Sequence, residues 1–166
     1  MHNELAEHVI ATSNRALTPE AERFLCDARH IAKSVNCFDF VPSNYENAWR
    51  ILDTLPRGLF CEWGSGLGAV TGLAELLGFD ACGIEQDHVL CLRSRDLFFA
   101  HGLNATIYQG SYFESEVRAD IYYVYCWPSI FQSTEEHFKN IAIPTSRLLI
   151  CHGQDDTRVK RLSSET

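Results

Sequence analysis

Two kinds of hydrophobic pattern alternate along the chain, one typical of buried strands and the other of helices. Between the apolar runs, apolar residues recur every three or four positions in 69–77, which indicates a helix with one apolar face. A further helix is expected over 88–100, with Gly102 placed to stop it. The apolar runs with the length of strands are 59–63, 81–85, 105–108, 121–126 and 148–151. Strands that alternate with helices predict a mostly parallel α/β sheet covered on both faces.

Helices are also expected ahead of the first strand. Residues 18–35 begin with Thr-Pro, a favourable helix start, and then repeat apolar positions at helical spacing. Ser43 and Glu46 have the spacing of a capping box for a second helix, which ends before Pro56. Residues 1–18 are only weakly periodic, and we interpret them as a short helix, an arm or a lid.

The length and composition of the chain predict a single domain. It has 166 residues, 46% of them hydrophobic and 22% charged, which is enough for one substantial core. No repeat, low-complexity block or linker divides it. We therefore expect one domain over residues 1–166, with a helical appendage at 1–36 and a Rossmann-like core at 37–152.

A glycine-rich loop follows the first predicted strand and opens a helix. Gly64, Gly66 and Gly68 alternate with other residues directly after Glu62. Glycines permit positive φ and a close approach of the backbone to a ligand, and the first N–H groups of the following helix remain free as donors. Glu85 ends the next strand, 21 residues after Gly64, where a carboxylate can accept both hydroxyls of a ribose. The pattern predicts a nucleoside ligand.

Glu62 distinguishes between two classes of nucleotide cofactor. With Ala69 as its last member, the loop also satisfies the dinucleotide pattern G-x-G-x-x-G/A. A dinucleotide brings an anionic pyrophosphate, which a carboxylate at Glu62 would repel. S-adenosylmethionine instead brings an ammonium and a sulfonium group, which the same carboxylate attracts. The acid ahead of the loop therefore favours S-adenosylmethionine.

With these residues the chain resembles the class I S-adenosylmethionine-dependent methyltransferases. The pattern E-x-G-x-G-x-G at 62–68 matches their first motif, and Glu85 lies where they place the acid that binds the ribose. The resemblance covers about residues 40–152. In outline the chain is most similar to the small lysine methyltransferases of the adenine-nucleotide-translocase and ATP-synthase c-subunit type, through the Phe-Val-Pro segment 40–42 and a shortened sheet.

The resemblance implies an open, Rossmann-like sheet of five strands in the order 3-2-1-4-5, with helices on both faces. The full family sheet has two further strands, and the residues after 152 are too few for both with their crossing helix. We therefore expect a sheet that lacks the last two strands. Its edge beside the fifth strand would then be free to pair with a second subunit, which predicts a homodimer.

The resemblance also implies cofactor contacts. Ser111 stands where the family usually has an acid that contacts the adenine amino group, and Tyr112 or Phe113 offers an aromatic face to the adenine. Asn44 and Tyr45 precede the first strand, where family members contact the methionine end, although Tyr45 is equally suited to the core. The expected cofactor-binding residues are Glu62, Gly64, Ser65, Gly66, Gly68, Glu85, Gln86, Ser111 and Tyr112.

We assign Tyr125, Trp127 and Pro128 as catalytic residues, because the family's fourth motif surrounds the transferable methyl group at the end of this strand. Pro128 would rigidify the turn. The two aromatic residues could exclude water and hold a cationic amine by cation–π attraction. The alternative is that they pack under the C-terminal segment as core residues.

The expected activity is transfer of a methyl group from S-adenosylmethionine to an acceptor, a lysine of a protein or another amine. Such a transfer mainly requires the acceptor to be aligned behind the methyl group in a site that excludes water. No dedicated base stands out, so solvent would deprotonate the amine. The alternatives are a binding module for S-adenosylmethionine or another nucleoside without catalysis and, third, an NAD-binding oxidoreductase.

Charge, cysteines and histidines argue against several other partners. The formal net charge of −8, with Arg158, Lys160 and Arg161 as the one basic cluster, disfavours a nucleic-acid partner. The seven cysteines form no C-x-x-C pair and the seven histidines are scattered, so no metal site is expected. No apolar run has the length of a membrane span, and the first residues do not resemble a signal peptide. We expect a cytoplasmic protein without a membrane partner.

Overall fold

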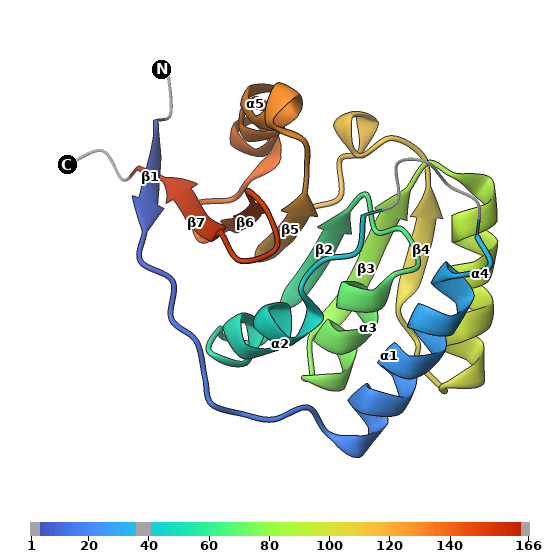
Figure 1. Cartoon of the computed structure of the whole chain (residues 1–166). Coiled ribbons are helices and arrows are strands. Elements are labelled where there is room, and N and C mark those ends of the chain that lie inside the picture. Colours follow the sequence, from blue (N-terminus) through green and yellow to red (C-terminus); the bar gives the residue numbers. More distant parts are fainter. Residues whose placement is uncertain (1–3, 36–40, 164–166) are drawn as a thin grey trace.

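The computed structural model describes residues 4–35 and 41–163. Its centre is a seven-stranded sheet in the order β1-β7-β6-β5-β2-β3-β4, flanked by helices (Figure 1). The strands are β1 (Leu5–His8), β2 (Leu59–Trp63), β3 (Asp80–Glu85), β4 (Thr106–Gln109), β5 (Ile121–Tyr125), β6 (Arg147–Cys151) and β7 (Thr157–Leu162). The helices are α1 (Pro19–Ala32), α2 (Tyr45–Asp53), α3 (Ala69–Leu76), α4 (His88–Ala100) and α5 (Phe131–Ile141), with short 3₁₀ turns η1 (Tyr112–Glu114) and η2 (Pro128–Ile130).

The five predicted parallel strands are present and adjacent in the expected order. The pairs β4–β3, β3–β2, β2–β5 and β5–β6 are all parallel. Alternate side chains of β2 face opposite sides of the sheet: Phe60 joins the hydrophobic cluster under α1–α4, whereas Cys61 and Trp63 join the one under α5. Because the strands are parallel, their carboxyl ends meet at one edge of the sheet, where ligands of open α/β folds bind.

Two antiparallel strands extend the sheet beyond β6, so the prediction of a five-stranded sheet was wrong in this respect. β7 pairs with β6, and β1 pairs with β7, at the sheet edge where both ends of the described chain lie (Figure 1). The helix, arm or lid expected at 1–18 is therefore replaced by a strand at Leu5–His8. The edge beside β6, expected to be open for a second subunit, is covered by β7.

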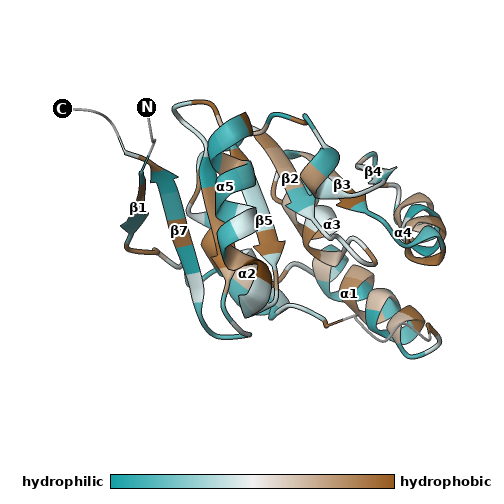
Figure 2. Ribbon diagram, turned by 90° about the horizontal axis from the view of Figure 1, so that it is seen from above, coloured by the Kyte–Doolittle hydropathy of each residue, from teal (hydrophilic) through white to brown (hydrophobic). Residues whose placement is uncertain are grey.

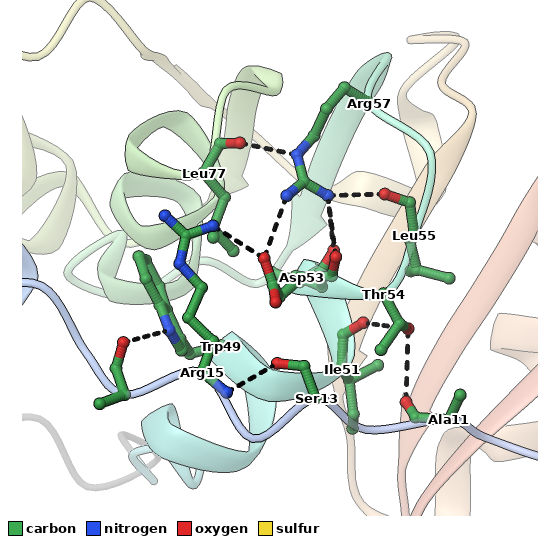
Figure 3. Close-up of polar contacts among 12 residues, drawn as sticks. Ala11, Ser13, Arg15, Trp49, Ile51, Asp53, Thr54, Leu55, Arg57 and Leu77 are labelled. Atoms are coloured by element: carbon green, nitrogen blue, oxygen red, sulfur yellow. Dashed lines mark hydrogen bonds and ion pairs between the residues drawn. The ribbon is translucent and has the colours of Figure 1, made fainter.

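The segment between β1 and α1 is held against α2 by polar contacts (Figure 3). Arg15 Nη1 donates to Asp53 Oδ1 at 2.9 Å, and Arg57 Nη2 lies 3.3 Å from the same carboxylate oxygen. Trp49 Nε1 donates to the carbonyl of Ala16 at 3.2 Å. These bonds hold the segment that connects β1, at the sheet edge, to the start of α1.

α1 forms where predicted and packs on α3 and α4. Thr18 caps it, since its Oγ1 accepts a hydrogen bond from Ala21 N at 3.2 Å. The fully buried Phe24 lies so close to α3 that a Cβ at Gly72 would be 2.2 Å from its ring. Figure 2 shows α1 and α5 as mixtures of hydrophilic and hydrophobic residues, as expected for helices with one face on a core.

α2 begins differently from the prediction. Asn44 is its N-cap, because its side-chain oxygen accepts from Asn47 N at 3.1 Å, so the capping box of Ser43 and Glu46 was wrong. Ser43 instead lines the large cavity described below. In the part of the chain that the structure describes, no helix is long and apolar enough to cross a membrane.

Candidate functional site

A cavity of about 820 Å³ lies at the carboxyl ends of the parallel strands. Its volume is in the range of small-molecule sites, which is roughly 300–1,000 Å³. Every predicted site residue except Gly68 and Pro128 lines it. The lining residues are Val41, Pro42, Ser43, Tyr45, Glu62, Gly64, Ser65, Gly66, Leu67, Ala69, Ile84, Glu85, Gln86, Asp87, Leu90, Gly110, Ser111, Tyr112, Phe113, Tyr125, Trp127 and Ile130.

The glycine-rich loop has the backbone conformation expected of it. Gly64, Gly66 and Gly68 have φ values of 66°, 56° and 71°, a region in which other residues are strained. Gly64 and Gly66 line the cavity, whereas Gly68 does not. A Cβ at Gly68 would lie 2.7 Å from the ring of Phe98, so this glycine permits the packing of α4 against the start of α3.

Ser65 lines the cavity, but its hydroxyl is buried against β3. Its side chain is buried, and within the described residues its Oγ has no hydrogen-bond partner. Buried polar groups are almost always paired, so this hydroxyl is an exception within the glycine-rich loop. Gly83 on β3 makes room for it, since a Cβ there would lie 2.8 Å from Ser65 Oγ.

Glu85 is bound to the loop as well as exposed to the cavity. Its Oε2 accepts from Gly66 N at 2.7 Å, and its Oε1 accepts from Asp87 N at 2.8 Å. An ionised carboxylate has about four acceptor positions, so each oxygen retains capacity for a ligand hydroxyl. The sequence pattern identified Glu85 but not its bond to Gly66.

Glu62 also has a second task that the sequence did not indicate. Its Oε2 accepts from Thr71 N at 2.7 Å and from Thr71 Oγ1 at 2.6 Å. Thr71 is the third residue of α3, so Glu62 takes the place of the capping side chain that Gly68 lacks.

The environment of Glu62 changes its expected charge. Burial, followed by the neighbouring charge of Glu85, raises the pKa of Glu62 to about 8, against the hydrogen bonds from Thr71. At neutral pH the carboxyl group is therefore protonated in the free protein, and it becomes charged only if a cation arrives beside it. The sequence had suggested a permanent negative charge at this position.

An aromatic group forms the wall of the cavity after β4. Tyr112 stacks on the buried Trp63 with ring centroids 5.1 Å apart and an interplanar angle of 4°, and its hydroxyl lies 3.1 Å from Thr134 Oγ1. The ring of Phe113 is 4.3 Å from that of Tyr112 and is 40% exposed. Because one face of Tyr112 is already covered, Phe113 and the adjoining Ser111 present the more accessible surface.

The end of β5 supplies the opposite wall. Tyr125 is half-buried and Trp127 is 53% exposed, and both line the cavity. This exposure differs from that of a core residue, the alternative considered for Trp127. Pro128 begins η2 and stays out of the cavity wall. The sequence singled out Tyr45, which lines the cavity, and Asn44, whose amide instead donates to Asp155 Oδ1 at 3.1 Å.

Several lining residues carried no signal of their own. Val41 and Pro42 were noted only for the family likeness, and Phe40 of the same segment lies outside the described residues. Asp87 and Leu90 also line the cavity. Asp87 caps α4, since its Oδ1 accepts a hydrogen bond from Leu90 N at 2.9 Å. In the sequence, only their position shortly after Glu85 indicated that these two residues belong to the site.

The described lining is acidic. It contains the carboxyl groups of Glu62, Glu85 and Asp87 and no lysine, arginine or histidine. Among the described residues, no group of three or more His, Cys, Asp or Glu side chains could hold a metal ion. The carboxyl groups of the wall therefore suit a ligand with positive charge, beside which Glu62 can ionise, and with hydroxyl groups to donate.

The fold is that of the S-adenosylmethionine-dependent methyltransferases. The chain is similar to a methyltransferase from Geobacter sulfurreducens, with a TM-score of 0.67 and 14% identity over 89% of this chain and 93% of that one. It is similar to an RNA methyltransferase from Salinibacter ruber solved with S-adenosyl-L-homocysteine, with a TM-score of 0.57 and 19% identity over 92% and 95%.

A third similar structure is an S-adenosylmethionine-dependent methyltransferase from Thiobacillus denitrificans in complex with S-adenosyl-L-homocysteine, with a TM-score of 0.57 and 17% identity over 74% of this chain. The chain spans 54% of that protein and 46% of a matched protein from Pyrococcus horikoshii. No family model matches the sequence, and no curated protein matches it. At these identities the similarity establishes the fold.

Proposed function

We propose that this chain, folded as one domain, is an S-adenosylmethionine-dependent methyltransferase whose acceptor is an amine. The observation that carries the proposal is the joint position of the glycine loop and Glu85 in the cavity wall, at the carboxyl ends of β2 and β3. Two proteins of the same fold were solved with S-adenosyl-L-homocysteine, which supports the same cofactor here. The proposal includes the resemblance to the small lysine methyltransferases, which makes a lysine side chain one candidate for the amine.

The cofactor contacts follow from the groups that line the cavity. Glu85 would accept the ribose hydroxyls through the acceptor positions that its two backbone bonds leave free. Gly64 and Gly66 allow close approach of the backbone, and Ser65 lines the cavity between them. Gln86 lies next to Glu85 on the same wall.

The adenine would lie against the segment after β4. Ser111 lines this part of the cavity, and Phe113 and Tyr112 provide apolar ring surface beside it. Aromatic rings stack favourably on a planar base. The methionine end would then extend past Gly64 toward Glu62 and Tyr45, where the carboxyl of Glu62 can ionise beside a cation.

The acceptor would enter beside Trp127 and Tyr125. S-adenosylmethionine supplies the methyl group on a sulfonium, and the residues of the chain position the acceptor nitrogen and exclude water from it. The exposed ring of Trp127 can attract a cationic amine at the cavity mouth, and the acidic wall disfavours an anionic acceptor. The nitrogen would lose its proton to solvent before transfer.

A nucleic-acid partner is disfavoured by the pairing of the basic cluster. Arg158 lies 2.9 Å from Asp156 and 3.9 Å from Glu7, and Lys160 pairs with Glu135. These ion pairs neutralise most of the positive charge on β7, whereas nucleic-acid binding needs free cations along a surface. We propose a protein or small-molecule amine as the acceptor.

A titration tests the proposal. We expect S-adenosylmethionine and S-adenosylhomocysteine to bind, and NAD to bind at least about a hundredfold more weakly, because the wall carries acids where a pyrophosphate would lie. Tighter binding of NAD would overturn the assignment of the cofactor. Incorporation of labelled methyl groups into amine acceptors then tests catalysis, and binding without any transfer would identify a binding module instead.

A further inference from the structure

Two cysteines lie side by side in the centre of the sheet. Cys61 on β2 and Cys82 on β3 are register partners of a parallel pair, so their side chains point to the same face. Adjacent strands are about 4.8 Å apart, and cysteines joined by disulfides have Cα atoms roughly 4.4–6.8 Å apart. Both are free thiols in the structure. The spacing of the two Cα atoms therefore lies in the range that a disulfide spans.

A second cavity reaches one of the two thiols. It has a volume of about 270 Å³ and lies toward the amino ends of β2 and β3, away from the glycine loop. Cys82 lines it and is partly exposed, whereas Cys61 is fully buried. Arg118 and Tyr108 also line it. A small polar molecule can therefore reach Cys82 first.

The segment before β5 lines this cavity and is anchored. The hydroxyl of Tyr122 donates to Val117 O at 3.1 Å and accepts from Ala119 N at 2.9 Å. Val117, Arg118 and Ala119 all form part of the cavity wall. The anchored segment therefore forms a fixed part of the wall of this cavity.

The two thiols differ in acidity. The hydrogen bond from the Cys61 thiol lowers the pKa of Cys82, against the opposing effects of burial and of Asp80. The same hydrogen bond, together with burial, raises the pKa of Cys61. Since the thiolate is the nucleophile, Cys82 is suited to attack and Cys61 to act second.

We propose that Cys61 and Cys82 form a redox pair that closes an intramolecular disulfide when hydrogen peroxide enters the second cavity. The Cys82 thiolate attacks one peroxide oxygen, the O–O bond breaks, and the hydroxide that leaves takes up a proton to become water. The Cys61 sulfur then attacks the sulfenic acid at Cys82, the S–O bond breaks, and the released hydroxide leaves as water with the proton of Cys61. Two thiols and one peroxide give one disulfide and two waters.

This site is independent of the proposed function. The disulfide would tie together β2 and β3, the strands that also carry Glu62 and Glu85, but its chemistry needs neither the cofactor nor an acceptor. Such a bond would be transient in a reducing compartment, as is typical of thiol pairs that sense oxidants.

Mass spectrometry tests the proposal on the full chain. The protein is treated with equimolar hydrogen peroxide, its remaining thiols are alkylated, and it is digested without reduction. We expect a Cys61–Cys82 linked peptide that has lost two hydrogen atoms and is separated again by dithiothreitol. The Cys26→Ser variant is the control, because Cys26 is exposed on α1 and takes no part.

Two variants separate the roles of the thiols. In Cys61→Ser the sulfenic acid at Cys82 cannot be resolved, so dimedone should label Cys82, whereas Cys82→Ser should leave Cys61 unlabelled. Circular dichroism checks that both variants fold. Absence of the linked peptide from the oxidised wild-type chain, or oxidation of Cys26 or Cys91 in its place, would overturn the proposal even if neither variant folds.

Discussion

Glu62 and Glu85 are both engaged by backbone N–H groups in the absence of a ligand, one at the start of α3 and the other in the glycine loop. Removing either carboxyl group therefore disturbs the local structure as well as any ligand contact. Glutamine retains one acceptor oxygen of the same size and removes the charge. For this reason the tests of these two residues use glutamine rather than alanine.

We predict that Glu85→Gln weakens the binding of S-adenosylmethionine by about 10- to 150-fold. The reason is the loss of charge-assisted hydrogen bonds to the ribose, worth roughly 1.5–3 kcal/mol. Isothermal titration calorimetry measures the affinity. Glu75→Gln is a matched control, since the Glu75 carboxylate also accepts from two backbone N–H groups, those of Asn104 and Ala105. Equal affinities of the two variants would remove the ribose assignment.

Protonation of Glu62 should be linked to binding of a cation. Its pKa of about 8 means that the free protein holds this proton at neutral pH, and a cationic ligand favours the ionised form. Binding therefore releases a proton, and affinity for S-adenosylmethionine should rise by up to about tenfold per pH unit as pH increases toward 8. Calorimetry in buffers of different ionisation enthalpy measures the proton release. The Glu62→Gln variant should show neither this proton release nor this dependence of affinity on pH. If its pH profile equals that of the wild type, Glu62 is not the group that releases the proton.

The same shift affects the stability of the free protein. The unfolded chain loses the proton of Glu62 near its ordinary pKa of 4.5, whereas the folded chain keeps it until about pH 8. Between these values the folded state binds more protons, so this residue lowers stability as pH rises. Glu62→Gln should flatten that decline in urea unfolding measured from pH 5 to 8.

Trp127 should affect turnover more than stability. We predict that Trp127→Ala lowers kcat/KM for the acceptor at least about tenfold while cofactor affinity stays within about twofold, because its ring lines the cavity mouth. Its 53% exposure indicates a small loss of folding free energy. Phe99→Ala, which removes an aromatic ring 89% exposed on α4, is the control. Full activity of folded Trp127→Ala would exclude the acceptor assignment.

At the scale of elements, polar side chains connect two of the helices to other parts of the chain. α3 starts at a glycine, and the side chain of Glu62 supplies its cap from the neighbouring strand. α2 holds the segment that leads to α1, chiefly through Asp53, which pairs with Arg15 and Arg57 (Figure 3). The connection between the sheet edge and the helices of one face therefore depends on a few polar bonds.

Asp53→Ala should loosen this connection. It leaves Arg15 and Arg57 without their carboxylate partner, and we predict a loss of about 1 kcal/mol, or about 2–4 °C in melting temperature. Arg23→Ala is the control, because its pair with Glu20 is exposed and 3.7 Å long, and it should leave the melting temperature unchanged. Equal melting temperatures of the two variants would show that the segment needs no such anchor.

At the scale of the whole molecule, the two ends of the described chain form one sheet edge. β1 pairs with β7 from Leu5 opposite Leu162 to His8 opposite Val159, and β7 pairs with β6. The cofactor cavity lies farther along the sheet, around β2, β3 and β5. The edge and the cavity are therefore separate parts of one fold.

Deleting residues 1–8 should test that separation. The deletion removes β1 and leaves the edge of β7 unpaired, so we predict a lower melting temperature and self-association of the variant, since free strand edges promote pairing between chains. Affinity for S-adenosylmethionine should stay within about threefold, because the cavity residues remain. Light scattering and calorimetry measure the two effects, and an unchanged melting temperature would mean that β1 contributes little to the fold.

Local patterns in the sequence determined much of this protein. The pattern of apolar residues located the five parallel strands and the helices α1 and α3, because such patterns reflect which face of an element is buried. The glycines and Glu85 located the cavity, because the loop after one parallel strand and the carboxylate at the end of the next meet at the same edge of the sheet.

The tertiary structure decided what depends on distant partners. β1 is four residues long, and its hydrogen-bond partners lie at the other end of the chain, so no local pattern distinguishes it from a weak helix. The bond from Glu62 to Thr71 and the raised pKa of Glu62 depend on how deeply the folded chain buries that carboxyl group. Register, burial and the pairing of polar groups arise only when separate segments meet, and these set the charge of the site.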